Sequence, residues 1–229
     1  MKKMMVLAGL LIGLNSMLFS LEESWLSVGP DFGVYAYHGS DLEDFYTASP
    51  GINFTGYGFV DRKNVGFFFN YGFLFPVLDN HSGNLKPILQ YDFIIGVGFR
   101  YDINERLKLH FGIGPEFNLL YLLDSEDKNV KTTDYIISFG LGEDIGIKFD
   151  ITDIVYLDVG TTVTYNFAAF REVESTTDNW KNTAQEYSGW VNNFSMPGIR
   201  PYITVGFNIY QERARWGKPE PVSDSEDDL

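Results

Sequence analysis

The sequence predicts an all-β protein, an eight-stranded antiparallel up-and-down transmembrane β-barrel, on three observations. Apolar and polar residues alternate strictly over long segments, and successive side chains of a strand point to opposite faces. The clearest segments, residues 89–101 and 107–119, exceed the about 9–11 residues that a tilted strand needs to cross a bilayer. Glycines gather on the polar face of these segments.

These two segments form a predicted hairpin with a tight turn at 102–106. In the first strand the odd positions, from Leu89 to Tyr101, are all apolar or aromatic. The even positions run from Gln90 to Arg100 and include two glycines. The same parity resumes after the turn, so one face of the hairpin is apolar throughout.

Six further segments alternate in the same way, with some irregularities. Pro30 and Pro115 lack the N–H group that a ladder needs, so we expect a bulge at each. The apolar parity slips near Gly56, where we also expect a bulge, and Glu143 falls on the apolar face. The remaining predicted strands are residues 25–36, 52–61, 65–75, 135–150, 155–167 and 202–209.

The connections alternate in length. Long predicted loops span 37–51, 76–88, 121–134 and 168–198, whereas the other connections are short turns. An even number of strands places both termini on one side. In a transmembrane barrel that side is the periplasm, where turns are short, and the long loops face outward.

Residues 1–20 read as a cleaved signal peptide, with Lys2 and Lys3 before an apolar run shorter than the about 20 residues of a transmembrane helix. The barrel is assigned to 21–210, and 211–229 to an acidic periplasmic tail without fixed structure. The net charge of −14 argues against a nucleic-acid partner. Absence of cysteine excludes disulfides and thiolate metal sites.

Alternation alone does not say which face points outward. A soluble barrel of the lipocalin kind would have the apolar face inside and a charged exterior. Glycine weakens strands and is a poor choice for a solvated face, but small residues fit the narrow interior of an eight-stranded barrel. The glycines on the polar face therefore favour a barrel with its apolar face toward lipid.

The sequence resembles the eight-stranded bacterial outer-membrane barrels, especially the outer membrane protein W-like group. The likeness rests on the last strand, residues 200–210, and on the segment Gly-Val-Gly-Phe-Arg-Tyr at 96–101. Such barrels usually end on an aromatic residue, whereas here the chain continues past Tyr210. The resemblance implies an outer-membrane location and passage of small hydrophobic compounds.

The polar face carries charges that we assign to the bore. Two hypotheses follow: a polarised conduit that selects solutes, or a plug in which acids pair with bases because unpaired buried charge is costly. Eight strands leave an interior about wide enough for side chains alone, which favours the plug. The predicted network comprises Asp31, Asp92, Arg100, Lys108, His110, Glu116, Asp144, Lys148 and Asp158.

Aromatic residues of the longest loop are candidates for binding a partner, because aromatic side chains concentrate binding energy. They could equally pack on the barrel rim or rest in lipid headgroups. These residues are Trp180, Tyr187, Trp190 and Phe194.

An enzyme that modifies lipid A is a remote alternative, since a histidine beside a serine and an acid is the required kind of trio. We expect no catalytic site, because these residue types are common in turns. Nor do we expect a cofactor or a metal, the acidic segment 124–127 being at most a loose calcium site. The candidate trio residues are His38, Ser40, Asp41, Asp79, His81 and Ser82.

The sequence thus predicts a barrel that serves as a narrow porin-like or hydrophobic-solute pathway, or else as a structural or surface-interaction protein with a plugged lumen. Its partners would be outer-membrane lipid, small hydrophobic solutes or a host surface ligand bound by the loops. The sequence identifies no solute, receptor or oligomeric state.

Overall fold

The structure is a computed structural model, and it describes residues 23–40, 42, 44–59, 64–80, 85–124, 130–177 and 182–210. The predicted signal peptide and acidic tail lie outside these residues. Within them every regular element is a strand. The described part of the chain holds no helix long and apolar enough to cross a membrane.

The described chain forms ten strands, eight long enough to build the barrel wall and two (β4 and β9) that lie beside it. In chain order they are β1 Glu23–Tyr37, β2 Phe45–Phe59, β3 Val65–Leu74, β4 Leu78–Asp79, β5 Lys86–Asp102, β6 Leu107–Asp124, β7 Val130–Asp150, β8 Val155–Thr177, β9 Asn182–Trp190 and β10 Met196–Tyr210.

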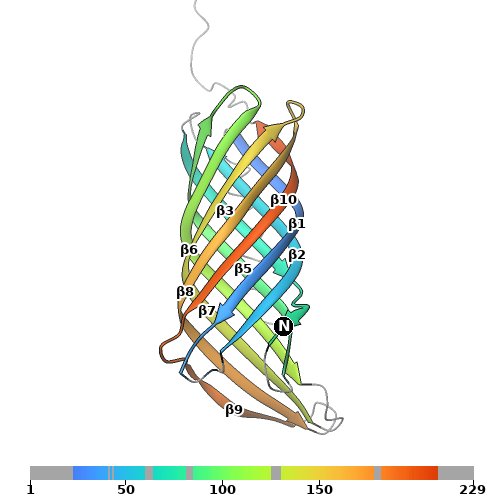
Figure 1. Ribbon diagram of the computed structural model, residues 1–229, viewed down its shortest axis with the longest axis vertical. Coiled ribbons are helices and arrows are strands. Elements are labelled where there is room, and N and C mark those ends of the chain that lie inside the picture. Colours follow the sequence, from blue (N-terminus) through green and yellow to red (C-terminus); the bar gives the residue numbers. More distant parts are fainter. Residues whose placement is uncertain are drawn as a thin grey trace, which may run out of the picture.

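Each wall strand pairs antiparallel with its neighbours in sequence, in the order β1–β2–β3–β5–β6–β7–β8–β10. The last strand, β10, pairs back onto β1, from Glu23 with Tyr210 to Tyr35 with Gly198, and so closes the barrel. Figure 1 shows these strands tilted around one axis. The predicted eight-stranded up-and-down barrel is confirmed.

The apolar face is the outer wall. Side chains such as Phe54, Val97, Ile147, Val163 and Phe207 are each more than a third exposed. The polar face is buried in the bore, which therefore forms the core of the molecule. Its fully enclosed polar residues include Asn53, Asn70, Asp92, Asp144, Asn166 and Arg200.

The structure corrects the predicted loop boundaries, because several strands run past the expected ends. The segment 168–198 is not one loop: β8 continues to Thr177 and pairs there with β9 on one side and with the start of β7 on the other, at the lower end of Figure 1. A register shift opposite Phe139 and Gly140 leaves Phe167 unpaired between β7 and β8. Because of this extra residue, the inward side chains of β8 change from even-numbered to odd-numbered positions. The alternation expected from residues 155–167 therefore does not continue, although the strand does.

The parity slip in β2 has a different cause from the predicted bulge at Gly56. The register of β2 with both β1 and β3 is continuous through this residue. Instead, Tyr57 and Phe59 point into the bore and are almost fully buried, whereas Ile52 and Phe54 point outward. Inward and outward side chains therefore still alternate along β2. The apolar pattern changes parity because the inward positions at this end of the barrel are aromatic.

The predicted bulges at Pro30 and Pro115 are also absent. Pro30 pairs with Ile52 and Pro115 with Leu141 in unshifted registers. On the opposite edge of each of these strands, in the β1–β10 and β5–β6 ladders, residue pairs near the proline are missing, but the register is the same before and after the gap. Each proline thus removes a ladder hydrogen bond and adds no residue to the strand.

Candidate functional site in the bore

The structure places all nine predicted network residues on the inner face of the barrel. Eight of them are buried, and Lys108 is half-buried at the turn-side rim. Most of them belong to three clusters along the bore, which we call the Arg200 cluster, the Asp144 cluster and the turn-side cluster. Asn70 links the first two clusters, and Arg100 pairs separately with Glu23.

The Arg200 cluster spans the bore at mid-height. From β10, the Arg200 guanidinium donates to Asp31 Oδ2 of β1 at 2.8 Å and to Asn53 Oδ1 of β2 at 2.9 Å. It also donates to Asn70 of β3 and lies 3.6 Å from Asp92 Oδ2 of β5. One fully buried cation therefore joins five strands around the circumference.

The Asp144 cluster lies next toward the turn side. Asp144 accepts hydrogen bonds from Tyr57 at 2.6 Å, from Asn70 at 3.0 Å and from Tyr202 at 3.2 Å. His110 Nδ1 lies 3.4 Å from the same carboxylate, and His110 Nε2 lies 2.8 Å from Asp158. A histidine between two buried carboxylates is stabilised when both its nitrogens carry protons.

The turn-side cluster lies at the end of the bore where the strands are joined by short turns. Lys108 and Lys148 both bind Asp150, the former at 3.1 Å. The Lys148 ammonium also lies 4.6 Å from the ring centroids of Trp25 and Tyr156, a cation–π arrangement. These contacts hold a buried ammonium among aromatic rings.

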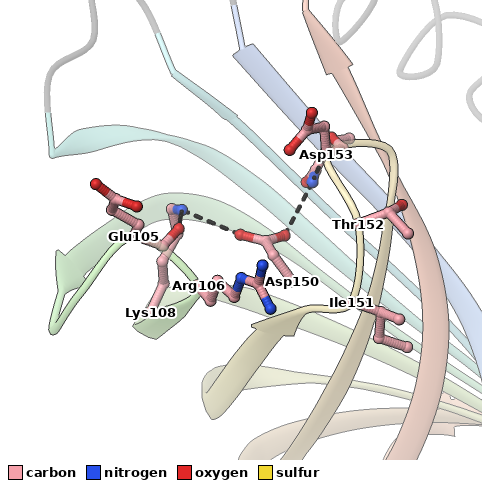
Figure 2. A pocket seen from close by; sticks show the side chains of 8 residues that line it. Glu105, Arg106, Lys108, Asp150, Ile151, Thr152 and Asp153 are labelled. Carbon is pink, nitrogen blue, oxygen red and sulfur yellow. Dashed lines mark hydrogen bonds and ion pairs between the residues drawn. The ribbon is translucent and has the colours of Figure 1, made fainter.

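A pocket of about 350 Å³ opens at this rim. Figure 2 shows Asp150 at its centre, bonded to Lys108, with Arg106 and Glu105 on the adjoining turn. Asn208 Nδ2 donates to Asp150 Oδ1 at 2.9 Å. At the centre of the pocket the Asp150 carboxylate is already bound by the ammonium groups of Lys108 and Lys148, so it is not free to bind a ligand.

Two apolar clusters also occupy the bore. Near the turn side, among the charged groups, Trp25, Tyr57, Phe59, Phe68, Ile94 and Tyr156 pack together. Near the loop side a larger cluster crosses the barrel, which we call the loop-side plug. Its members are Tyr35, Tyr37, Phe45, Leu74, Leu120, Leu122, Ile136, Ala169, Val191, Phe194 and Met196.

Glycines make room for these large inner side chains. A Cβ at Gly112 would come within 2.6 Å of the Phe68 ring, and one at Gly98 within 2.7 Å of Tyr57. A Cβ at Gly72 would overlap the Arg200 guanidinium, whose Cζ would lie 2.6 Å away. The glycine-lined face therefore holds side chains that reach across from opposite strands.

One group of inner polar side chains lacks hydrogen-bond partners among the described residues. Both carboxylate oxygens of Glu116 and one of Asp92 are buried without a hydrogen bond. The amide groups of Asn118 and Asn166 are likewise unpaired at both atoms. All four side chains are at most 2 % exposed.

The four predicted loop aromatics do not form one surface. Trp190 lies at the end of β9 and packs on the outer wall against Phe139 and Phe170. Tyr187 is an exposed residue of β9, and Phe194 is buried in the loop-side plug. Trp180 lies outside the described residues.

The candidate catalytic residues are not brought together where the structure describes them. His38 Nδ1 lies 3.3 Å from Asp44, and Ser40 accepts a hydrogen bond from Asn193 at 3.0 Å. Asp79 belongs to β4, which pairs with β2. Asp41, His81, Ser82 and residues 125–127 of the acidic segment lie outside the described residues.

The sequence prediction missed important members of the clusters. Arg200 has the same parity as the inward residue Tyr202, so its position was available from the alternation of the last strand. Tyr57 was missed because an aromatic ring in an alternating segment predicts a lipid-facing group. Which side chains meet across the bore was not available from any single strand.

Three solved structures are similar to this chain in fold. A major outer membrane protein from Thermus thermophilus is 13% identical, with a TM-score of 0.50 over 81% of this chain and 99% of that one. The outer membrane protein AlkL in DMPC lipid bilayers is 14% identical, with a TM-score of 0.50 over 85% of this chain and 93% of that one. Neisserial surface protein A is 13% identical, with a TM-score of 0.49 over 81% and 97%.

No family model matches this chain. No curated protein matches it either. At these identities the structural likeness shows the fold alone. It establishes that this closed barrel is an architecture found in bacterial outer membrane proteins.

Proposed function

We propose that this chain is a bacterial outer-membrane barrel with a sealed bore that acts as a structural and surface-interaction protein rather than as an open pore or an enzyme. Residues 1–20 would direct export and be cleaved, and the short turns would face the periplasm. The membrane assignment is supported by the exposed apolar wall and by the outer membrane proteins that share the fold. Membership of the outer membrane protein W-like group is part of the same proposal.

One observation carries the sealed bore: Arg200 crosses it at mid-height and is fully buried among Asp31, Asn53 and Asn70. The loop-side plug lies on one side of this bridge and the Asp144 cluster on the other. A solute would have to displace buried ion pairs and packed rings. This arrangement argues against the predicted porin-like or hydrophobic-solute pathway along the axis.

Planar-bilayer recording of the refolded protein tests this proposal. We expect no stable openings from the unmodified chain, even at high salt. The variant Arg200→Ala with Phe194→Ala, which removes the bridge and part of the plug, should conduct if it folds. Stable openings of large conductance from the unmodified chain contradict the sealed bore.

The membrane assignment has a separate test. The mature chain should need detergent or lipid to remain dispersed, and its gel mobility in detergent should change on heating as the barrel unfolds. A chain that stays monomeric in plain buffer without any amphiphile contradicts the proposal.

A surface-interaction role is supported by the β8–β9 extension, which lies at the lower end of Figure 1 and exposes Tyr187. Replacing residues 174–186 by Asn-Gly shortens this extension and leaves the paired residues Val173 and Tyr187 joined by a two-residue turn. Cells bearing the shortened barrel should lose attachment to a host surface that the full-length barrel supports. Equal attachment by both proteins contradicts this role.

A further inference from the structure

We propose that the bore contains a cation-binding cage, formed by Asp92, Glu116, Asn118 and Asn166, that takes an oxygen-preferring divalent ion such as Ca²⁺. This inference goes beyond the proposed function, since a barrel with a sealed bore needs no ion for its surface role.

The four side chains lie close together in the register, on the inner faces of β5, β6 and β8. Asp92 of β5 pairs with Asn118 of β6 in the register. Glu116 lies two residues before Asn118 on the same inner face, and Gly140 of β7 separates it from Asn166 of β8. The Asn166 side-chain oxygen lies over Gly140, in the space that a Cβ there would occupy. It therefore approaches Glu116 across a position without a side chain.

The cage offers oxygen ligands that no protein group uses. One oxygen of Asp92 and both of Glu116 have no hydrogen bond of good geometry among the described residues, and neither do the amide groups of Asn118 and Asn166. The Asp92 and Asn166 side chains are nevertheless close enough to the Glu116 carboxyl for weak hydrogen bonds, which a bound ion would replace. Ca²⁺ is held by carboxylate and amide oxygens together with water, in flexible geometry. Partnerless buried carboxylates are otherwise rare, because burying them costs free energy.

The cage has more acidic groups than basic ones around it. Asp31, Asp92 and Glu116 contribute three carboxyl groups to this part of the bore, and a bound cation would favour the ionised form of each. Only Arg200 opposes them, and it is bound to Asp31 and near Asp92. A bound Ca²⁺ beside Glu116 would offset the remaining two charges.

Apolar residues shield the cage from above and below. Ile94, which pairs with Glu116, fills the space over Gly142 on the turn side. Leu120, Ile136 and Met196 of the loop-side plug lie on the other side. The Ser138 hydroxyl donates to Met196 Sδ at 3.8 Å and holds that side chain over the cage. An ion bound here would be sheltered from bulk water.

The described residues contain no group of three or more His, Asp and Glu side chains placed to hold a metal. The cage has two carboxylates, and the amides replace further acids. Fewer charged ligands predict a modest affinity, in the range of about 10⁻⁴–10⁻³ M found for extracellular calcium modules.

Terbium luminescence tests the proposal. The full chain is refolded in detergent in the presence of EDTA, and the chelator is removed before Tb³⁺ is added. Tb³⁺ replaces Ca²⁺ at oxygen sites, and the Tyr35 hydroxyl, which donates to Asp92, places a sensitising ring at the cage. We expect saturable emission on tyrosine excitation that Ca²⁺ reverses, and a thermal unfolding midpoint that rises with Ca²⁺ but not with matched NaCl. The ion is also added during refolding, because the closed bore restricts later entry.

Glu116→Gln keeps the shape of the side chain and removes one charge, so it should weaken Tb³⁺ binding at least about tenfold. Asn166→Leu should do the same without changing any charge. Glu143→Gln is the matched control: it removes a carboxylate from the outer wall of the adjacent strand, where Glu143 pairs with Ile113 and Val163. This control should bind as the unmodified chain does, provided that all variants show the heat-dependent gel shift of a folded barrel.

The proposal is overturned if the unmodified chain shows no saturable binding under either refolding condition. It is also overturned if Glu143→Gln weakens binding as much as Glu116→Gln, because the acidic exterior would then be the site. If Na⁺ raises the thermal unfolding midpoint as much as Ca²⁺ does, a site selective for divalent ions is likewise excluded.

Discussion

At the scale of single residues, the barrel is held from inside by groups that pair across the bore. Arg200 is the extreme case, because its guanidinium is fully buried and contacts side chains of four other strands. A buried ion pair adds little net stability relative to apolar residues of similar size, but removal of one partner leaves the other charge uncompensated. The Arg200 cluster should therefore be sensitive to single changes and tolerant of paired ones.

Arg200→Met should lower the free energy of unfolding by about 3–5 kcal/mol, because Asp31 and Asp92 would remain buried without their cation. Denaturant unfolding in lipid vesicles measures the loss. Arg106→Met is the control: Arg106 is exposed on the turn between β5 and β6, so the change should alter the free energy of unfolding by only about 0.5 kcal/mol. Equal losses in the two variants contradict the bridging role of Arg200.

Gly112 shows how small inner residues set the packing. Gly112→Ala would drive a methyl group into the Phe68 ring and should destabilise the barrel by about 1–3 kcal/mol. Gly189→Ala, whose Cβ would approach only the exposed Tyr187 side chain at 3.2 Å, should cost much less. The same unfolding measurement compares them. If both variants are as stable as the unmodified chain, the inner wall is not closely packed at Gly112.

At the scale of the strand, β8 has two parts with different roles. Up to Asn166 it is a wall strand that pairs with β10, and beyond the unpaired Phe167 it carries β9. Ala169 and the segment after β9 contribute to the loop-side plug. The part of β8 beyond Val173 contributes no residue to this plug, although it pairs with the first four residues of β7, whereas its base is part of the core.

The Asn-Gly replacement of residues 174–186 should leave the thermal unfolding midpoint and the heat-dependent gel shift of the barrel unchanged, because it retains every residue of the loop-side plug. A deletion that also removes Val191, Phe194 and Met196 should prevent folding. Both are measured by refolding yield into vesicles. A shortened barrel that fails to fold would show that the extension is needed to close the wall.

At the scale of the whole molecule, the outer wall is apolar except for isolated groups, and Glu143 is the clearest of these. The structure places it outward, between Ile113 and Val163 of the neighbouring strands. Charged residues on the lipid face of a barrel are destabilising, and acids less so than bases. The position is therefore informative about which medium surrounds the wall.

Glu143→Leu should stabilise the barrel in lipid vesicles by about 1 kcal/mol, because it removes a carboxylate from the hydrocarbon face. Ile145→Glu, two residues away on the same face and 54% exposed, should cost a similar amount. Unfolding in vesicles measures both. If the leucine variant is less stable in lipid and more prone to aggregate in detergent, the wall at this position does not face hydrocarbon.

Some features of this protein followed from the sequence alone. Alternation fixes which side chains share a face, since it depends only on the two-residue period of a strand. It therefore predicted the number of wall strands and their order. The glycines on the polar face then indicated the apolar exterior and the inward direction of residues such as Asp92 and Lys148. It failed at Phe167, where one unpaired residue reverses the parity, and at Tyr57, where an aromatic ring faces inward.

The grouping of the inner side chains was decided only by the tertiary structure. Closure of the barrel places the first and last strands of the chain side by side. The stagger between strands then sets which inward side chains lie at the same level of the bore. Arg200 meets Asp31 and Asn53 for this reason, although they lie far apart in sequence. Alternation along a strand contains no information about partners across the bore, so the sealed arrangement and the unpaired oxygens around Glu116 became visible only in the folded barrel.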